Sequence, residues 1–186
     1  MTDPACSDAT TWEELPSHVE TRPLQSALSF DVFYVSEFSS LAALARALTG
    51  SAAAEDIAQD AMIAAYRRWN EIQQLDVPAA WVRRICANLS TSFIRRRAAE
   101  ARAVLRAGGM RTHETELPPA DEEFWAEVRR LPRRQAQALS LHYIYDMQVC
   151  DIALTLDCSE STVKAHLVRG RAAMSRRLTT NEEDRP

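Results

Sequence analysis

The apolar residues of this chain recur at three- and four-residue steps, which is the spacing of one face of an α-helix. The first such stretch ends at Thr49-Gly50, and the third begins at Pro78, which suits the first turn of a helix. No stretch alternates apolar and polar residues as a half-buried strand would. The pattern predicts an all-α protein whose helices cover residues 30–49, 51–69, 78–97, 121–130, 132–145, 148–156 and 160–178.

Two kinds of segment interrupt the helical pattern. Gly108-Gly109 and Pro118-Pro119 bracket a stretch with little apolar content, which predicts a flexible linker. The first residues lack periodicity and are rich in Thr, Ser, Pro and acids, which is typical of a flexible extension. We therefore expect an extension, a helical domain, a linker, a second helical domain and a tail, at residues 1–29, 30–102, 103–119, 120–180 and 181–186.

The last two predicted helices have the layout of a helix-turn-helix. A turn, Asp157-Cys158-Ser159, separates a short helix from a longer basic one, and Ser159 stands where an N-cap is expected. The inward stripe of the longer helix is Val163, Leu167, Met174 and Leu178. The inward stripe of the helix that begins at Pro78 is Val82, Ile85, Leu89 and Phe93.

The charge is distributed unevenly along the chain, although its net value is only −4 over 186 residues. Residues 1–78 hold four basic and twelve acidic side chains, whereas residues 79–113 hold eight arginines and one glutamate. Residues 114–158 are again acidic, and residues 159–186 are mildly basic. Basic blocks can follow nucleic-acid phosphates and an acidic block can meet a basic protein surface, although a basic run is often only the solvated face of a helix.

Composition excludes several classes of protein. Hydrophobic residues make up 46% and charged residues 26%, as in ordinary soluble domains, and no apolar run is long enough to span a membrane. Acids near the start argue against a signal peptide, so we expect a cytoplasmic protein without membrane insertion. The cysteines and histidines share no ligand spacing, so we expect reduced cysteines, no metal and no cofactor. A nuclease built from Glu55, Asp56, Asp60 and His113 would lack a second ligand set, so we expect no catalytic residues.

Two blocks of the sequence resemble a known family. The segment LPRRQAQALSLHYIYDMQVCDIALTLDCSESTVKAHLVRGRAAMSRRL resembles region 4 of the extracytoplasmic-function (group IV) sigma factors of bacterial RNA polymerase. The segments AAAEDIAQDAMIAAYRRW and PAAWVRRICANLSTSFIRRR are similar to regions 2.2 to 2.4 of that family. The blocks occur in the family's order and cover about 30–97 and 121–178. The resemblance implies a region 2 bundle and a region 4 helix-turn-helix, and a factor that gives core RNA polymerase its promoter specificity.

The second predicted helix carries a group of acidic and polar side chains in its N-terminal half. Acids at that end also simply stabilise a helix through its dipole. In the family this helix binds the clamp helices of the largest catalytic subunit, so the resemblance implies a core-binding face made of Glu55, Asp56, Gln59 and Asp60. Tyr66 and Trp69 either extend this face or belong to the core.

The third predicted helix combines arginines, an amide and an aromatic side chain, which are the groups that hold single-stranded DNA. The resemblance implies that this helix reads and opens the −10 promoter element, and that loop 70–77 captures a flipped base. The side chains expected to do so are Trp81, Arg84, Asn88, Ser92, Arg95 and Arg96. Trp81 is also a candidate for the core, and Ser92 replaces an Asp that is usual in the family.

The recognition helix of the helix-turn-helix should enter the major groove of the −35 element. Its expected DNA-facing residues are Thr162, Lys164, Ala165, His166, Val168, Arg169 and Arg171. Arg169 matches the two acceptors of a guanine edge, whereas Lys164 suits a phosphate. Ser161 replaces the family's usual Gly, and His166 a frequent Arg, so the −35 sequence cannot be copied from relatives.

The resemblance implies three partners: core RNA polymerase, promoter DNA and an anti-sigma factor. We expect an anti-sigma factor because no further domain follows residue 178 to regulate the chain. The alternative is a helix-turn-helix regulator that binds duplex DNA as a dimer without polymerase. That alternative leaves the acidic second helix and the Trp81–Arg97 block unexplained.

Overall fold

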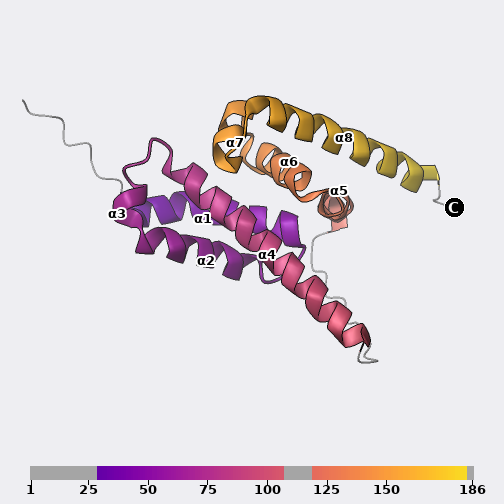
Figure 1. The fold of residues 1–186 in the computed structure, drawn as a ribbon, viewed down its shortest axis with the longest axis horizontal. Helices are drawn as coiled ribbons and strands as arrows, with labels where there is room; N and C mark the ends of the chain where they lie inside the picture. Colours follow the sequence, from indigo (N-terminus) through magenta and orange to yellow (C-terminus); the bar gives the residue numbers. More distant parts are fainter. Residues whose placement is uncertain (1–28, 107–118, 184–186) are drawn as a thin grey trace, which may run out of the picture.

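The computed structural model describes residues 29–106 and 119–183, and every regular element in these ranges is a helix (Figure 1). This confirms the predicted all-α class. The helices are α1 (Phe30–Thr49), α2 (Ala54–Arg67), α3 (Trp69–Ile72), α4 (Pro78–Arg106), α5 (Pro119–Arg129), α6 (Arg133–Tyr145), α7 (Val149–Leu156) and α8 (Glu160–Glu183).

Helix α1 begins and ends where the apolar pattern predicts. Gly50 follows it at φ 60°, a left-handed conformation that suits glycine, and donates its N–H to the Arg46 carbonyl at 2.8 Å. The second predicted helix is shorter than expected, because Arg68 has φ −120° and interrupts it before the single turn of α3. Part of the predicted loop 70–77 is therefore helical, and only residues 73–77 lie between α3 and α4.

Helix α4 continues well beyond the predicted end at residue 97. The sequence from Ala98 to Arg106 consists mostly of strong helix formers. Arg102 and Arg106 also donate side-chain hydrogen bonds to the carbonyls four residues earlier, at 3.0 and 3.2 Å. The described ends of the predicted linker are thus helical, while residues 107–118 and most of the N-terminal extension lie outside the described residues.

The core is one continuous cluster of buried side chains that both groups of helices supply. In the first group, α1, α2 and α4 pack against one another around Leu41, Leu44 and Met62. In the second group, α6 and α8 approach closely at Gly170, where an added Cβ would lie 2.8 Å from Leu139 Cδ1. The two groups also touch, because α1 lies against α5 and α6 and α4 lies against α7 (Figure 1).

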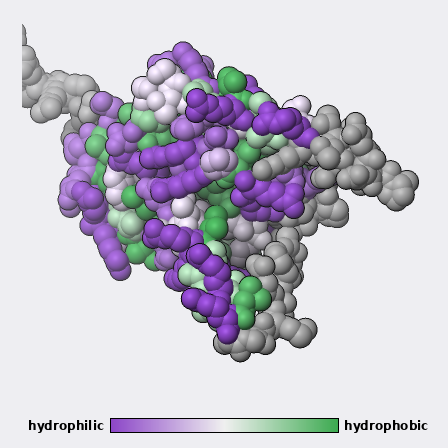
Figure 2. All heavy atoms as spheres, turned by 45° about the vertical axis from the view of Figure 1, so that its right-hand side comes forward, coloured by the Kyte–Doolittle hydropathy of each residue, from purple (hydrophilic) through white to green (hydrophobic). Residues whose placement is uncertain are grey.

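The surface is mainly hydrophilic. On the face in Figure 2, polar side chains cover most of the described surface, and apolar areas lie between them as separate patches. Among the described residues, no helix combines the length and the apolar character that a membrane span needs.

Candidate nucleic-acid interface

The four acidic and polar side chains predicted on α2 are all exposed. The opposite side of the helix buries Ala58, Ala61, Met62 and Ala65, so the helix turns Glu55, Asp56, Gln59 and Asp60 outward. Glu55 forms an exposed ion pair with Arg46 at 3.5 Å, which contributes little to stability. Asp56 and Asp60 form no ion pair with the described residues, so their charges are available to a partner.

Tyr66, near the end of α2, and Trp69, the first residue of α3, have different environments. The side chain of Tyr66 is 65% exposed, although its ring lies 5.0 Å from Phe30. Trp69 packs against Phe33 and Phe30, with ring centroids 4.9 and 5.3 Å away, and is part of the wall of the core. Only Tyr66 extends the outer surface of α2.

The six side chains predicted to read the −10 element share one face of α4. Their spacing of three, four and one residues keeps Trp81, Arg84, Asn88, Ser92, Arg95 and Arg96 within about a third of the helix circumference. The predicted inward stripe was only partly correct. Val82 is fully buried, whereas Ile85, Leu89 and Phe93 are half-buried, and the more deeply buried positions are Cys86, Ala87 and Ser90.

Trp81 is partly in the core and partly at the surface, so it matches both of the roles predicted for it. It is half-buried and packs against the core, while the Arg68 guanidinium lies 5.7 Å from its ring centroid. It is the first of the six residues along the α4 face, and it follows shortly after the turn formed by residues 73–77.

An open groove of about 570 Å³ runs between α2 and α4. Ser92, Arg95, Arg96 and Asp60 supply its polar side chains, and Phe93 is its aromatic wall. The guanidinium of Arg96 lies 5.9 Å from the Phe93 ring centroid. A groove that combines arginines with a half-buried aromatic ring can hold an unstacked nucleobase and its phosphate. Asp60, predicted to bind protein, thus lies beside residues predicted to bind DNA.

The predicted recognition helix α8 presents an outward face, as its stripe requires. Val163, Leu167 and Met174 are buried, whereas Lys164, Val168, Arg169 and Arg171 are exposed, and Thr162, Ala165 and His166 are half-buried. Ser159 is the N-cap as predicted, since its Oγ accepts the Thr162 N–H at 3.3 Å. The side chain of Leu178 lies outside the described residues.

His166 lies in a cationic environment on α8. Burial, together with the nearby charges of Arg169 and Arg134, lowers the pKa of His166 below its ordinary value. The imidazole is therefore neutral at physiological pH, and it offers a potential partner hydrogen bonds rather than a positive charge.

Two further candidates for DNA binding, which the sequence pattern did not predict, are Arg133 and Arg134 at the start of α6. Partial burial, then the charges of Arg134 and Arg95, lowers the pKa of Arg133. Guanidinium groups from α4 and α6 thus lie close enough to influence one another, and the Arg134 charge acts on His166 of α8. The Arg-Arg pair is visible in the sequence, but its proximity to α4 depends on tertiary packing.

Three contacts join α4 to the second group of helices, and two of them involve the predicted −10 face. Arg133 Nη2 donates a hydrogen bond to Asn88 Oδ1 at 2.6 Å, and Arg84 pairs with Asp157 at 3.3 Å. Gln137 Nε2 donates to the Ala87 carbonyl at 3.1 Å. Two of the six predicted DNA-reading side chains are therefore engaged within the chain.

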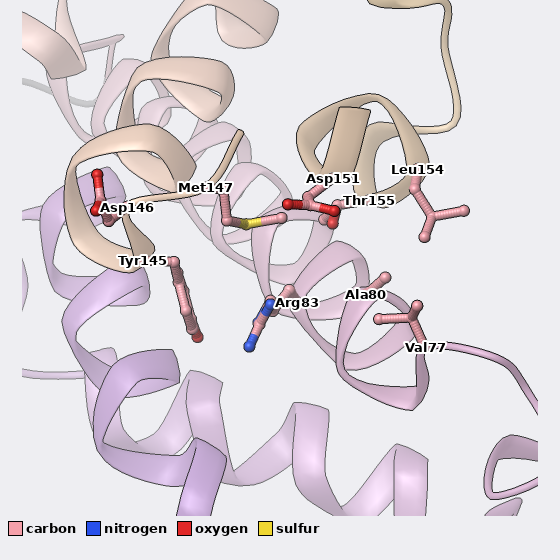
Figure 3. A pocket seen from close by; sticks show the side chains of 9 residues that line it. All are labelled: Val77, Ala80, Arg83, Tyr145, Asp146, Met147, Asp151, Leu154 and Thr155. Carbon is pink, nitrogen blue, oxygen red and sulfur yellow. The ribbon is translucent and has the colours of Figure 1, made fainter. Parts of the chain in front are cut away.

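A cavity of about 280 Å³ lies at the same junction, between the start of α4 and α7 (Figure 3). Arg83 lies on one wall with its guanidinium 4.2 Å from the Tyr145 ring centroid, and it pairs with Glu37 at 2.7 Å. Burial raises the pKa of Tyr145, so its hydroxyl stays protonated. Because Arg83 is committed to these partners, we assign it to the packing of the junction rather than to DNA.

The cysteines in the described part of the chain show no paired arrangement. Cys86 is buried, its thiol contacts the Leu41 carbonyl at 3.5 Å, and burial raises its pKa to about 12. It is a thiol of the core rather than a reactive thiolate. Cys150 is exposed and Cys158 half-buried, and Cys6 lies outside the described residues.

Two protein-family models match this chain. The model "Sigma-70 region 2" matches residues 34–100, and "Sigma-70, region 4" matches residues 121–174. The relative "Probable RNA polymerase sigma factor RfaY" of Xanthomonas campestris is 30% identical over 155 residues, which are 75% of this chain but only 38% of that protein. "ECF RNA polymerase sigma factor EcfG" of Rhodopseudomonas palustris is 29% identical over 160 residues, which are 82% of this chain and 86% of that protein.

Two solved structures share the fold. The sigma factor RpoE from Bartonella quintana, in complex with the anti-sigma factor NepR, superposes with a TM-score of 0.67 at 23% identity, covering 84% of this chain and 98% of that one. CnrH, in complex with the cytosolic domain of CnrY, gives a TM-score of 0.61 at 22% identity, covering 81% and 88%. At these identities the likeness concerns the fold alone.

Proposed function

Because this chain belongs to the sigma-70 family, as a factor of the extracytoplasmic-function type with regions 2 and 4, we propose that it directs core RNA polymerase to promoters by reading −10 and −35 elements. The observation that carries this proposal is the pairing of two surfaces in one helical group. An exposed acidic face on α2 lies next to a basic, DNA-compatible face on α4. A regulator that binds only duplex DNA needs neither of them.

In this proposal each surface has a separate task. The carboxylates of Asp56 and Asp60 bind a basic surface of core polymerase. The α4 face holds the unpaired −10 strand, with Asn88 bonding a base and Arg95 and Arg96 holding phosphates. Helix α8 lies in the major groove of the −35 duplex. The chain itself has no catalytic role, because the polymerase carries out the chemistry.

We further propose that an anti-sigma factor controls this chain and that it acts in the cytoplasm. Two structural neighbours were solved with an anti-sigma factor or with a cytosolic domain of a second protein. Helices α1, α4, α6 and α7 form a junction between regions 2 and 4 that a protein partner can recognise.

The test is transcription with purified core polymerase on fragments of the source genome, followed by mapping of the RNA 5′ ends. We expect initiation only when chain and core are both present, at starts preceded by one shared pair of −35 and −10 sequences. A duplex-only regulator would bind DNA without core and create no new start. The absence of chain-dependent starts would contradict the proposal.

Two substitutions on α8 distinguish base reading from phosphate binding. We expect one to reduce sequence preference and the other to reduce affinity for all sequences. Arg169→Ala removes a two-donor contact to a guanine edge, worth about 1–3 kcal/mol of discrimination, and should relax preference at one or two −35 positions. Lys164→Ala removes a phosphate contact, so affinity should fall about equally on all sequences and the salt slope by about one unit.

Both quantities come from fluorescence anisotropy of the chain–core complex on promoter and scrambled duplexes at several salt concentrations. Lys164 pairs with Glu160 at 3.5 Å, but both side chains are exposed, so the loss of that pair has little effect of its own. An unchanged −35 preference in Arg169→Ala would mean that another face of α8 enters the groove.

A further inference from the structure

The C-terminal part of α4 carries an apolar stripe that no described helix of this chain covers. From Ile94 onward the helix projects away from the other helices (Figure 1), and its residues are exposed except for the half-buried Ala101. The stripe, which we call the distal stripe, consists of Ile94, Ala98, Ala101 and Leu105, and its two large members are 42% and 54% exposed. Because most helical stability in proteins comes from the packing of an apolar face, this part of α4 would gain stability from a partner on the stripe.

The distal stripe has the spacing of a coiled-coil seam. Its members follow one another at steps of four, three and four residues, which is the alternation of the a and d positions of a heptad. They lie within about a sixth of the helix circumference. A stripe of that width fits one facing helix and is narrower than the apolar face of a helix that lies in a membrane surface. The two alanines leave room for large side chains of the facing helix.

Arginines flank the distal stripe on both sides. The e and g positions of the heptad hold Arg95, Arg97 and Arg102, together with one apolar residue, Val104. Side chains at these positions pair across the interface of a coiled coil and set the choice of partner. Arg97 and Arg102 form no ion pair with the described residues, and Glu100, the one acid of residues 94–106, lies outside the flanking positions.

Charge and shape together identify the occupant. A second copy of this chain would place arginine against arginine along the stripe, which opposes association. DNA would use the arginines but not the stripe, since most protein–DNA hydrogen bonds go to phosphate and sugar. A protein helix with an apolar seam between rows of aspartate or glutamate matches both features.

We propose that residues 94–106 of α4 form a docking site for an acidic amphipathic helix of another protein. The two helices pair as a short coiled coil, in which the distal stripe packs against the partner's apolar seam and Arg97 and Arg102 bond the partner's carboxylates. The site does not depend on the proposed function, because Arg95 is the only −10 candidate at a flanking position.

The experiment uses the full-length chain and a fluorescein-labelled synthetic peptide, measured by fluorescence anisotropy. The peptide has about three heptads, with Leu at a and d, Glu at e and g, and Ala or Gln elsewhere. Its glutamates repel between copies and keep it monomeric. The stripe variant is Ala98→Gln with Leu105→Gln, which leaves the net charge unchanged and introduces a strong helix former. The matched control is Ala103→Gln, the same exchange of residue type on the opposite side of the helix.

A second variant tests the flanking charges. Arg97→Glu with Arg102→Glu is measured with the same peptide and with a second peptide that carries Lys in place of Glu. Circular dichroism confirms that each variant is folded.

We expect wild type and the Ala103→Gln control to bind the Glu peptide equally, and the stripe variant to bind it at least about tenfold more weakly, because a leucine contact is lost from the seam. Wild type should not bind the Lys peptide. The charge variant should bind the Lys peptide and lose the Glu peptide, since both sets of flanking charges are then reversed.

Equal binding of the Glu peptide by wild type and the stripe variant would overturn the proposal, because it would show charge attraction without a seam. A failure of wild type to bind that peptide would also overturn it. A wild-type dimer that the stripe variant loses, measured by size-exclusion chromatography with light scattering, would assign the stripe to a second copy instead. Co-sedimentation of wild type, but not of the stripe variant, with phosphatidylglycerol vesicles would assign it to a membrane surface instead.

Discussion

Reversing the charges of Asp56 and Asp60 together, as Asp56→Arg with Asp60→Arg, should abolish association with core polymerase. Both carboxylates are exposed on α2 and unpaired among the described residues, so a basic partner surface would meet them directly. The substitution replaces two attractive contacts by like-charge contacts that cost several kcal/mol, and we expect at least about a hundredfold loss of affinity. Co-purification and anisotropy with labelled core measure it.

The control for this variant must carry the same change in net charge. Asp76→Arg with Glu100→Arg reverses two exposed acids of region 2 that do not belong to α2, and core binding should persist. Glu100 pairs with Arg96 at 3.7 Å, but both side chains are exposed, so the loss of that pair has little effect of its own. Arg at position 56 also faces the N-terminal end of the helix dipole, which costs about 0.3–1 kcal/mol, so a small fall in melting temperature is expected while helix content is retained. Equal core binding by wild type and the α2 variant would contradict the assignment of the core-binding face to α2.

Asn88→Ala should reduce initiation far more on a fully paired promoter than on one already mismatched at −10. A hydrogen bond to an unpaired base helps to offset the cost of unstacking it, and a premelted template removes that cost in advance. We expect a loss of about tenfold or more on the paired template and about threefold or less on the mismatched one, from the usual worth of one hydrogen bond at a buried site. Run-off transcription on the two templates gives the ratio.

The structure supplies a control that the sequence alone does not. Arg133→Ala breaks the same Arg133–Asn88 hydrogen bond from the other side and leaves the Asn88 amide in place. If Asn88 acts on DNA, Arg133→Ala should not reproduce the defect on paired templates. Equal defects in the two variants, or equal losses on the two templates, would place the role of Asn88 in packing.

The sequence predicted those features that are set within one helix or one turn. The bounds of α1 follow from its apolar spacing and Gly50, and the N-cap of α8 follows from the hydroxyl of Ser159. It also placed the six −10 candidates on one face, since helical spacing alone determines that. The shortened second helix depended on the backbone conformation of Arg68, which residue type does not dictate.

Features that depend on contacts between helices could not be predicted from the sequence pattern. Ala87 and Ser90 are buried although their positions lie off the apolar stripe of α4, because helices of both groups surround it. Gln137 has the polarity of a surface residue, yet it is almost fully buried because α4 supplies acceptors for its amide. The residues that join regions 2 and 4 were therefore absent from the predicted sites, whereas those directed outward from single helices were present.

The position of Lys164 determines how this protein can be attached to a surface or a dye. Of the 22 basic residues it is the only lysine, and its side chain is 63% exposed on α8. Amine-coupling reagents will therefore react there and at the amino terminus. A chain immobilised through Lys164 would be held by the helix proposed to enter the major groove, so binding measured on such a chip would underestimate its affinity for duplex DNA. A tag at the C-terminal end avoids that attachment.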